Sequence, residues 1–336
     1  MEQLLTGLGV DDLSVLLGSR TRALAAARWL YAGETPDSLP ERIPRVSPEA
    51  WRAVRERCVH ALPRVVGRHA SADGTVKYAL QTQGATVETV LIPGRGRSTA
   101  CVSSQAGCTR DCAFCATARV GFSRNLRAGE MVGQFLVARA GAPAGAPLRN
   151  VVFMGMGEPL DNLDEVLQAL EVLGQAPAPQ LSASHLTVST SGPVPAMRRF
   201  LARSRANLAL SLNATTDALR WRLMPGVRSW TLSEVLEPLR ADHTGRLFFL
   251  EYVMLAGVND GDEDARRLVA LLEGIRARVN LIPFNPVEGS GLSASPVGRV
   301  LAFRDLVHRA GVRCLLRSER GAGIDAACGQ LAARPA

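Results

Sequence analysis

The chain has 336 residues, of which 47% are hydrophobic and 21% are charged, as is ordinary for a soluble globular protein. No apolar run has the length of a membrane span, and the acidic first residues lack the layout of a signal peptide, which argues against membrane and secreted proteins and makes a cytosolic location the expectation. The net charge of +8, carried almost entirely by arginine, is compatible with nucleic-acid binding or with a mildly basic, solvated surface.

Residues 1–72 are predicted to form a small helical accessory domain. The segment 19–33 repeats apolar residues at helical spacing and is expected to end at Gly33. A second helix is expected to begin after Ser47, whose side chain would cap it, with Pro48 in its first turn. This part of the sequence carries no recognisable chemistry.

A β extension is predicted for residues 73–98. Within it, residues 75–93 change to the alternating period of strands and are expected to form two strands joined by a turn at Gln83 and Gly84. The second of these strands contains Glu88.

Residues 99–336 are predicted to form an α/β barrel. The expected strands are TACVSS, NVVFMG, HLTVSTS, LALSLN, LFFLEYVML, VNLIPF and VRCLLR, with helical patterns such as LDEVLQALEVLG and DEDARRLVALLEGI between most of them. Short apolar strands separated by helices indicate parallel pairing. Because functional groups in such folds gather at the carboxyl ends of the strands, the polar residues that follow five of these strands are expected to converge on one rim.

Seven cysteines occur in the chain. In a reducing compartment they are expected to bind metal or to act in catalysis, rather than to form a disulfide scaffold. Four of them fall between Cys101 and Cys115, and this clustering favours a site. Cys58 and Cys314 lie alone in apolar or mixed surroundings and are expected to be buried structural thiols.

The stretch GCTRDCAFC spaces Cys108, Cys112 and Cys115 as C-x3-C-x2-C. This spacing does not match zinc ribbons or zinc fingers, and no histidine lies nearby to complete a tetrahedron. Three thiolates from one loop can hold three irons of a four-iron–four-sulfur cluster and leave the fourth iron open, with Phe114 shielding the cluster from water. The alternative is a zinc-stabilised loop that takes Cys101 as its fourth ligand.

After the first strand of an α/β barrel, this motif resembles that of the radical S-adenosylmethionine enzymes, in which the open iron binds the amino and carboxylate groups of S-adenosylmethionine. Further stretches, in order from about residue 73 to 333, resemble the RlmN/Cfr family of RNA adenosine methyltransferases. The resemblance implies a partial (βα)6-type radical-SAM barrel with a small N-terminal helical accessory domain and a β-hairpin extension. The stretches are VETVLIP, ACVSSQAGC, FMGMGEPLDN, TVSTSG, SLNATTD, LIPFNP and IDAACGQLA.

The resemblance also implies a role for each matching residue. The three loop cysteines would bind one 4Fe–4S cluster. Glu88 would be the proton acceptor, Cys328 would carry a methyl group, and Cys101 would be its resolving partner. The residues implied to contact S-adenosylmethionine are Gly157, Glu158, Ser189, Ser211, Leu212, Asn213 and Asn285.

The implied reaction methylates a ring carbon of adenosine, C2 in preference to C8, in 23S ribosomal RNA, with transfer RNA as a second candidate. These carbons are electrophilic, so one S-adenosylmethionine would first methylate Cys328. A second would give the 5′-deoxyadenosyl radical, which takes a hydrogen from the S-methyl group so that the carbon radical adds to the base. Glu88 would then accept the ring proton, and Cys101 would release the product as a disulfide forms. A low-potential electron donor and a disulfide reductant are implied partners.

Access to the base adds a requirement, because a ring carbon inside paired RNA is out of reach and the adenosine must be splayed out or single-stranded. Arg119, Arg124 and Arg127 follow the cysteine loop and are expected either to meet phosphates or only to solvate the loop.

The chain departs from the family pattern at two places. PGVRSW follows Met224, where the family usually has a short stretch of asparagine and basic residues, and Asn213 stands where some members have histidine. If PGVRSW helps to position RNA, the substrate differs, so a radical enzyme of the same mechanism acting on another substrate remains an alternative. A non-catalytic cluster- or zinc-containing RNA-binding module is the other, although such a module has no use for Cys328, Cys101 and Glu88.

Overall fold

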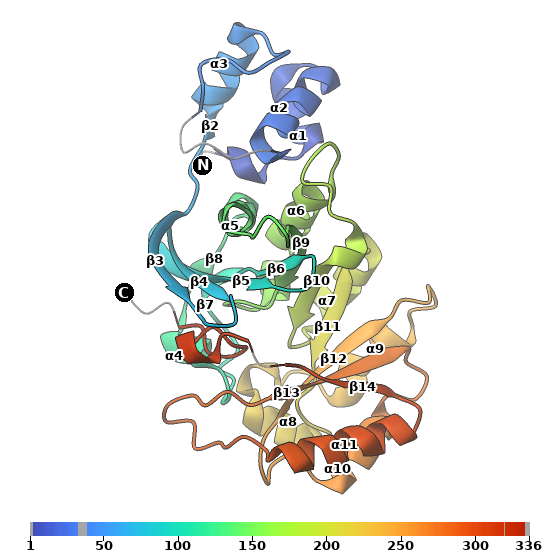
Figure 1. The fold of residues 1–336 in the computed structure, drawn as a ribbon. Helices are drawn as coiled ribbons and strands as arrows, with labels where there is room; N and C mark the ends of the chain where they lie inside the picture. The colour runs from blue at the N-terminus through green and yellow to red at the C-terminus, as the bar shows by residue number, and fades with distance from the viewer. Residues whose placement is uncertain (1–2, 33–38, 319, 333–336) are drawn as a thin grey trace.

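A ten-stranded sheet runs through most of the computed structural model, which describes residues 3–32, 39–318 and 320–332 (Figure 1). Its strands are β3 (Arg64–Ala70), β4 (Val76–Thr82), β5 (Ala85–Pro93), β6 (Ser98–Cys101), β9 (Leu148–Phe153), β10 (Leu186–Thr190), β11 (Asn207–Ser211), β12 (Phe248–Met254), β13 (Ala277–Pro283) and β14 (Arg313–Leu316). Their order is β14-β13-β12-β11-β10-β9-β6-β5-β4-β3. Neighbours from β6 to β14 pair in parallel, and those from β3 to β6 pair antiparallel. The seven predicted barrel strands are confirmed.

Helices connect most successive parallel strands, as crossover connections require. Local signals fix their starts and faces: α9 begins with a capping box between Thr231 and Glu234, and α6 turns Val166 and Leu170 into the core. The helices are α1 (Val10–Leu17), α2 (Arg20–Ala32), α3 (Pro48–Arg57), α4 (Ala116–Val120), α5 (Ala128–Ala140), α6 (Leu163–Gly174), α7 (Val194–Arg203), α8 (Asp217–Leu223), α9 (Leu232–Arg240), α10 (Asp262–Leu271) and α11 (Val297–Arg309). Short strands pair outside the large sheet, β1 (Gln3–Leu4) with β2 (Cys58–Val59) and β7 (Gln105–Gly107) with β8 (Phe122–Asn125).

The N-terminal helices α1, α2 and α3 form a group of their own at one end of the molecule (Figure 1). The Ser47 side chain accepts a hydrogen bond from the Ala50 backbone N–H and caps α3, as predicted. The expected helix end at Gly33 lies outside the described residues. The N-terminal segment packs closely on α5, because a Cβ atom at Gly129 would lie 2.6 Å from Leu4 Cβ.

The prediction of helix up to about residue 70 is wrong for β3, which pairs antiparallel with β4. This edge strand has almost all of its side chains exposed, so it lacks the apolar alternation by which a half-buried strand is recognised. Its backbone pairing to β4 is what holds it in the sheet. The strand precedes the predicted domain boundary at residue 72, and that boundary stays a prediction.

Strands β4 and β5 form the predicted hairpin. Thr82 pairs with Ala85, and the turn falls at Gln83 and Gly84, where Gly84 has a positive φ of 73°, a conformation that glycine adopts without strain. Since β5 also pairs with β6, the hairpin continues the sheet of the barrel, and Glu88 lies on the strand next to the one that Cys101 ends.

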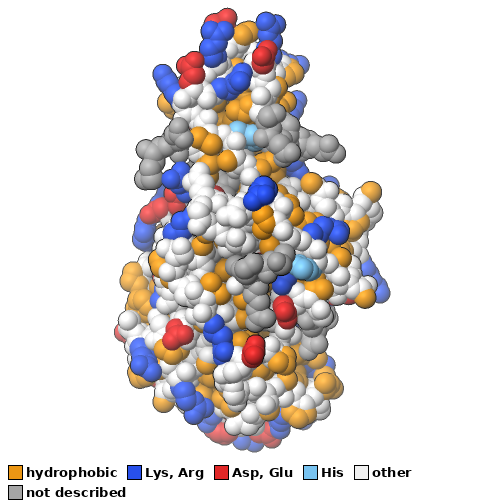
Figure 2. All heavy atoms as spheres, turned by 90° about the vertical axis from the view of Figure 1, so that its left-hand side faces the viewer, with side chains coloured by type: hydrophobic (Ala, Val, Ile, Leu, Met, Phe, Trp, Pro, Cys, Tyr) orange, Lys and Arg blue, Asp and Glu red, His pale blue; other side chains and the backbone are white. Residues whose placement is uncertain are grey.

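The face of the molecule that carries β3 bears dispersed basic side chains (Figure 2). Figure 2 shows Lys and Arg scattered from the N-terminal helices down to the barrel, rather than gathered in one continuous patch. Over the described ranges, no helix combines the length and the apolarity needed to cross a membrane.

Candidate active site

A cavity at the carboxyl ends of the parallel strands brings most of the predicted site residues together. Parallel strands end at the same edge of a sheet, so the loops that follow them meet there. Residues from the middle of the chain and from its C-terminal segment thereby face one space. The predicted residues that line it are Cys108, Cys112, Cys115, Gly157, Glu158, Ser189, Ser211, Asn213, Asn285 and Cys328.

The three loop cysteines lie between β7 and α4. Burial raises the pKa of Cys108 to about 12 and that of Cys112 well above its ordinary value. The Cys115 thiol adds to both rises, so the three sulfurs lie within electrostatic range of one another. Thiolates that are this close and this buried need a cation beside them to stay deprotonated, which is how metal-bound cysteines exist.

The PGVRSW segment packs against the backbone of the cysteine loop. The Gly226 N–H donates to the Arg110 carbonyl at 3.1 Å, and Arg110 Nη1 donates to the Gly226 carbonyl at 2.8 Å. A Cβ atom at Gly226 would lie 2.7 Å from the Arg110 carbonyl oxygen. The segment PGVRSW, in which the sequence departs from the family pattern, therefore helps to hold the cysteine loop in place.

We expect Gly226→Ala to displace the cysteine loop, because the added methyl group has no space against the Arg110 backbone. The free energy of unfolding should fall by about 1–3 kcal/mol, and less iron should be retained after anaerobic reconstitution. Denaturant unfolding and iron analysis measure the two effects. Gly298→Ala is the matched control, since a Cβ atom there meets nothing within 4 Å. Equal stability and iron content in both variants would contradict this role of Gly226.

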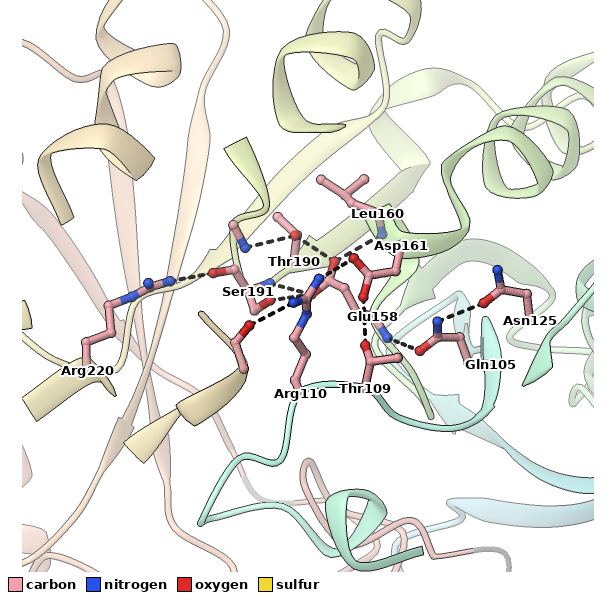
Figure 3. A network of polar contacts seen from close by, with 12 residues as sticks. Gln105, Thr109, Arg110, Asn125, Glu158, Leu160, Asp161, Thr190, Ser191 and Arg220 are labelled. Atoms are coloured by element: carbon pink, nitrogen blue, oxygen red, sulfur yellow. Dashed lines mark hydrogen bonds and ion pairs between the residues drawn. The ribbon is translucent and has the colours of Figure 1, made fainter. Parts of the chain in front are cut away.

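Glu158 is 3% exposed, and both of its carboxylate oxygens are held by neighbours (Figure 3). Oε1 accepts hydrogen bonds from the Leu160 N–H at 3.0 Å and from Thr190 Oγ1 at 2.7 Å. Oε2 accepts from the N–H and from the hydroxyl of Ser191, both at 2.7 Å. Glu158 thus ties the loop after β9 to the end of β10 while it lines the cavity. A carboxylate has about four acceptor sites, so these bonds leave little free capacity for the amine of S-adenosylmethionine.

Gly157 and two arginines complete the surroundings of Glu158. Gly157 has a φ of +100°, and a Cβ atom there would lie 2.5 Å from Gln105 Cβ, so only glycine fits. Arg110 Nε lies 4.0 Å from Glu158 Oε2. Arg220 is fully buried nearby, and burial lowers its pKa to about 10.

The ends of β10 and β11 place Ser189, Ser211 and Asn213 on the cavity. Asn213 has a φ of +59°, a left-handed conformation that asparagine tolerates better than most residues, and its Oδ1 accepts a hydrogen bond from the Val253 N–H at 2.9 Å. The side chain of Leu212 is fully buried in the hydrophobic core and does not line the cavity.

The C-terminal segment, residues 326–332, crosses the cysteine loop and carries Cys328 to the cavity wall. The Ala116 N–H donates to the Gly329 carbonyl at 2.6 Å, and Asn285 Nδ2 donates to the Cys328 carbonyl at 3.1 Å. The Cys328 side chain is accessible, and it lines the cavity. The neighbouring protein atoms desolvate its thiol and so raise the pKa of Cys328, and the Arg317 cation acts in the opposite direction.

Cys101 is buried at the end of β6, close to Cys328. Burial raises the pKa of Cys101 to about 12, the Cys328 thiol adds to the rise, and Arg317 opposes it. Both thiols are free. Cys101 does not line the cavity that the three loop cysteines line, which disfavours Cys101 as the fourth ligand of a zinc ion.

Glu88 faces a second cavity, which residues of the C-terminal segment also line. Its Oε1 lies 3.3 Å from Lys77 Nζ, and its Oε2 accepts a hydrogen bond from the Ala332 N–H at 2.8 Å. Arg119 lines the same cavity. The structure therefore does not place Glu88 in the cavity that Cys328 lines.

Comparisons with known proteins agree with this geometry. The model of the Radical SAM superfamily matches residues 102–269. The chain is 48% identical to the dual-specificity RNA methyltransferase RlmN of Paracoccus denitrificans, over 81% of this chain and 73% of that protein. It is 46% identical to the protein of the same name from Anaeromyxobacter dehalogenans, over 93% and 86%. The chain belongs to the RlmN/Cfr family.

A solved structure is similar to this RlmN/Cfr member over its whole fold. A radical SAM methyltransferase from Sphaerobacter thermophilus matches with a TM-score of 0.90 at 36% identity, over 99% of this chain and 100% of that chain. The predicted fold, a partial radical-SAM barrel, is thereby confirmed. Membership makes the chain an enzyme of the radical S-adenosylmethionine methyltransferase type.

RlmN/Cfr membership implies a 4Fe–4S cluster and S-adenosylmethionine as cofactors. The donor set fits, because three partly buried thiols of one loop line the cavity together. Within the described residues no three ligand side chains converge as the ligands of one ion would. Cluster cysteines each bind a different iron, so their sulfurs need not converge.

Glu251 and Arg317 are among the cavity residues of this RlmN/Cfr member that were not predicted from the sequence. Glu251 interrupts the apolar run LFFLEYVML, and a single charge within a buried strand is a signal that would have revealed it. Arg317 directly follows β14, so the rule that singled out the other strand ends applies to it too.

Proposed function

We propose that this enzyme methylates a ring carbon of an adenosine in RNA, C2 in preference to C8, through a methylated cysteine. The observation that carries the proposal is that Cys328 lines the cavity of the cysteine loop, while the Cys101 thiol at the end of β6 lies within electrostatic range of it. An ordinary methyl transfer has no use for a second thiol, whereas release of a cysteine-bound product requires one. The relatives' name, dual-specificity RNA methyltransferase, supports RNA as the substrate. The RNA that we propose first is 23S ribosomal RNA, and transfer RNA is the second candidate.

Each catalytic residue has one task. Cys328 accepts the methyl group of one S-adenosylmethionine. When bound, the single cluster supplies the electron that cleaves a second S-adenosylmethionine and so activates the S-methyl group. The activated carbon on the Cys328 sulfur bonds to the ring carbon. The ring radical that results gives up one electron, which the cluster would take back, and Glu88 accepts the ring proton. The Cys101 thiolate then attacks the Cys328 sulfur, the sulfur–carbon bond breaks, the released carbon takes up a proton, and the methylated base leaves as a disulfide forms. A disulfide reductant restores both thiols, and a low-potential donor supplies the electron.

Two structural features constrain this sequence of steps. Cys101 is protonated near neutral pH because its pKa is about 12, so its attack needs proton removal, which the Arg317 cation favours. Glu88 reaches the base only when residues 326–332 shift, because the Ala332 N–H occupies one of its oxygens.

The arginines that follow the cysteine loop differ in how free they are to contact RNA. Arg124 donates to both carboxylate oxygens of Glu130, at 2.7 and 2.8 Å, and is engaged within the protein. Arg119 lines the cavity of Glu88 and is the better candidate for a phosphate. The expected location is the cytosol, whose reducing conditions suit seven free thiols.

The test is a Cys101→Ala variant, which should accumulate a covalent adduct between Cys328 and RNA because no thiol remains to release the product. Denaturing gel electrophoresis and mass spectrometry of the tryptic peptide that contains residue 328 detect the adduct. Cys314→Ala, which removes a buried thiol of β14, should release methylated RNA normally. Free release of methylated product by Cys101→Ala would refute the assigned role. Nucleoside mass spectrometry of 23S ribosomal RNA and transfer RNA from a deletion strain would identify the target.

A further inference from the structure

Glu251 lies in the middle of β12 and faces the interior of the barrel. In the strand register it stands between Ser211 of β11 and Asn280 of β13, so these positions form one row across the sheet. Glu251 lines the cavity of the cysteine loop and also an adjoining cavity of about 800 Å³, which Cys328 lines as well. A space of this size has room for a nucleoside.

One oxygen of Glu251 has no partner among the described residues. Oε1 accepts a hydrogen bond from Asn280 Nδ2 at 2.8 Å, whereas Oε2 is buried and unbonded. Burial raises the pKa of Glu251, and Arg317 partly opposes the rise. A buried acceptor without a donor is unfavourable, so Oε2 is suited to receive a donor from a ligand.

The unbonded carboxyl lies near the residue that we assign to methyl transfer. Glu251 raises the pKa of the Cys328 thiol, which places the two groups within electrostatic range. Glu88, in contrast, is already engaged by Lys77 and Ala332 and faces the other cavity. A base that enters beside Cys328 therefore meets Glu251.

We infer that Oε2 of Glu251 accepts a hydrogen bond from the exocyclic amine of the target adenine, an inference that rests on the proposed function. In adenosine the exocyclic amine at C6 is the hydrogen-bond donor of the base, and the free ring nitrogens are acceptors. Guanine and hypoxanthine have an oxygen there, which would face Oε2 as a second acceptor. Glu251 is thus a specificity-determining residue, and Asn280 orients its carboxyl group through the bond to Oε1.

The test combines a substitution in the protein with one in the RNA. The unmodified protein and Glu251→Met receive RNA with adenosine or purine riboside, which lacks the amine, at the target position, and single-turnover rates are compared. We expect the unmodified protein to prefer adenosine by about tenfold or more, and Glu251→Met to process both substrates at the same lower rate. Glu251→Gln keeps an acceptor oxygen and should restore part of the preference, which a role in proton transfer would not allow.

Thr187→Val is the control, because Thr187 lines the same large cavity from β10, and this variant should keep the full preference. Undiminished preference in Glu251→Met would overturn the inference. Weakened S-adenosylmethionine binding by Glu251→Met without RNA would also overturn it, because the carboxyl would then serve the cofactor. If the unmodified protein methylates no adenosine, the proposed function fails together with the inference, so the two failures are distinguishable.

Discussion

Replacing Cys328 with alanine is expected to abolish RNA methylation, with a loss of about 10⁴-fold or more, because no other thiol stands at the same place on the cavity wall to carry the methyl group. Iron content and the cleavage of S-adenosylmethionine without RNA should persist, since the cysteine loop and the strand ends keep their side chains. Methylation is measured by nucleoside mass spectrometry, and cleavage by the release of 5′-deoxyadenosine.

Cys58→Ala is the matched control for Cys328→Ala, because Cys58 is buried in β2 and lines none of the three cavities described above. This variant should methylate RNA at the unmodified rate. Methylation that survives in Cys328→Ala would refute the cysteine-bound intermediate. Loss of iron in the same variant would instead show that Cys328 supports the cysteine loop.

Glu158→Leu is expected to lower the free energy of unfolding by about 3 kcal/mol or more. It should also reduce S-adenosylmethionine binding indirectly, because the loop after β9 and the end of β10, which both line the cavity, lose the side chain that joins them. The substitution leaves the donors of Leu160, Thr190 and Ser191 buried without their acceptor, and each such loss is costly. Denaturant unfolding measures the stability, and equilibrium dialysis of reconstituted protein measures the binding.

The control for Glu158→Leu is Asp164→Asn, which weakens an ion pair with Arg199 on the surface, where the Asp164 side chain is 72% exposed. Exposed pairs contribute about 0–1 kcal/mol, so this variant should be nearly as stable as the unmodified protein. Equal stability of Glu158→Leu and Asp164→Asn would contradict the structural role of Glu158.

Most of the parallel strands were predictable from the sequence because they are short apolar runs buried on both faces. The successive residues Leu208, Ala209 and Leu210 of β11, for example, are all fully buried. Strand β3 was not predictable, because its side chains face solvent and its position depends on pairing with β4. The hydrophobic pattern of the sequence therefore reveals strands that bury apolar side chains. It misses strands that are held in the sheet only by backbone pairing to a neighbouring strand.

The convergence of the site followed from the rule on strand ends, which placed Glu158, Asn213 and Asn285 around one cavity. Contacts between distant segments did not follow from it. The packing of Gly226 against Arg110 joins residues 116 positions apart, and the bond from Ala332 to Glu88 joins residues 244 positions apart. Neither leaves a periodic trace in the sequence, so a folded chain was needed to find them.

Cys101 and Cys328, whose thiols lie within electrostatic range of each other, are near opposite ends of residues 99–336 in the sequence. A bond between them would close a ring of about 227 residues (328 − 101). Rings of that length restrict the unfolded chain enough to stabilise the folded one by about 5 kcal/mol. Each turnover would then convert a linear chain into a closed one and back again. The resistance of the enzyme to unfolding would follow the oxidation state of one sulfur pair, highest just after the product leaves.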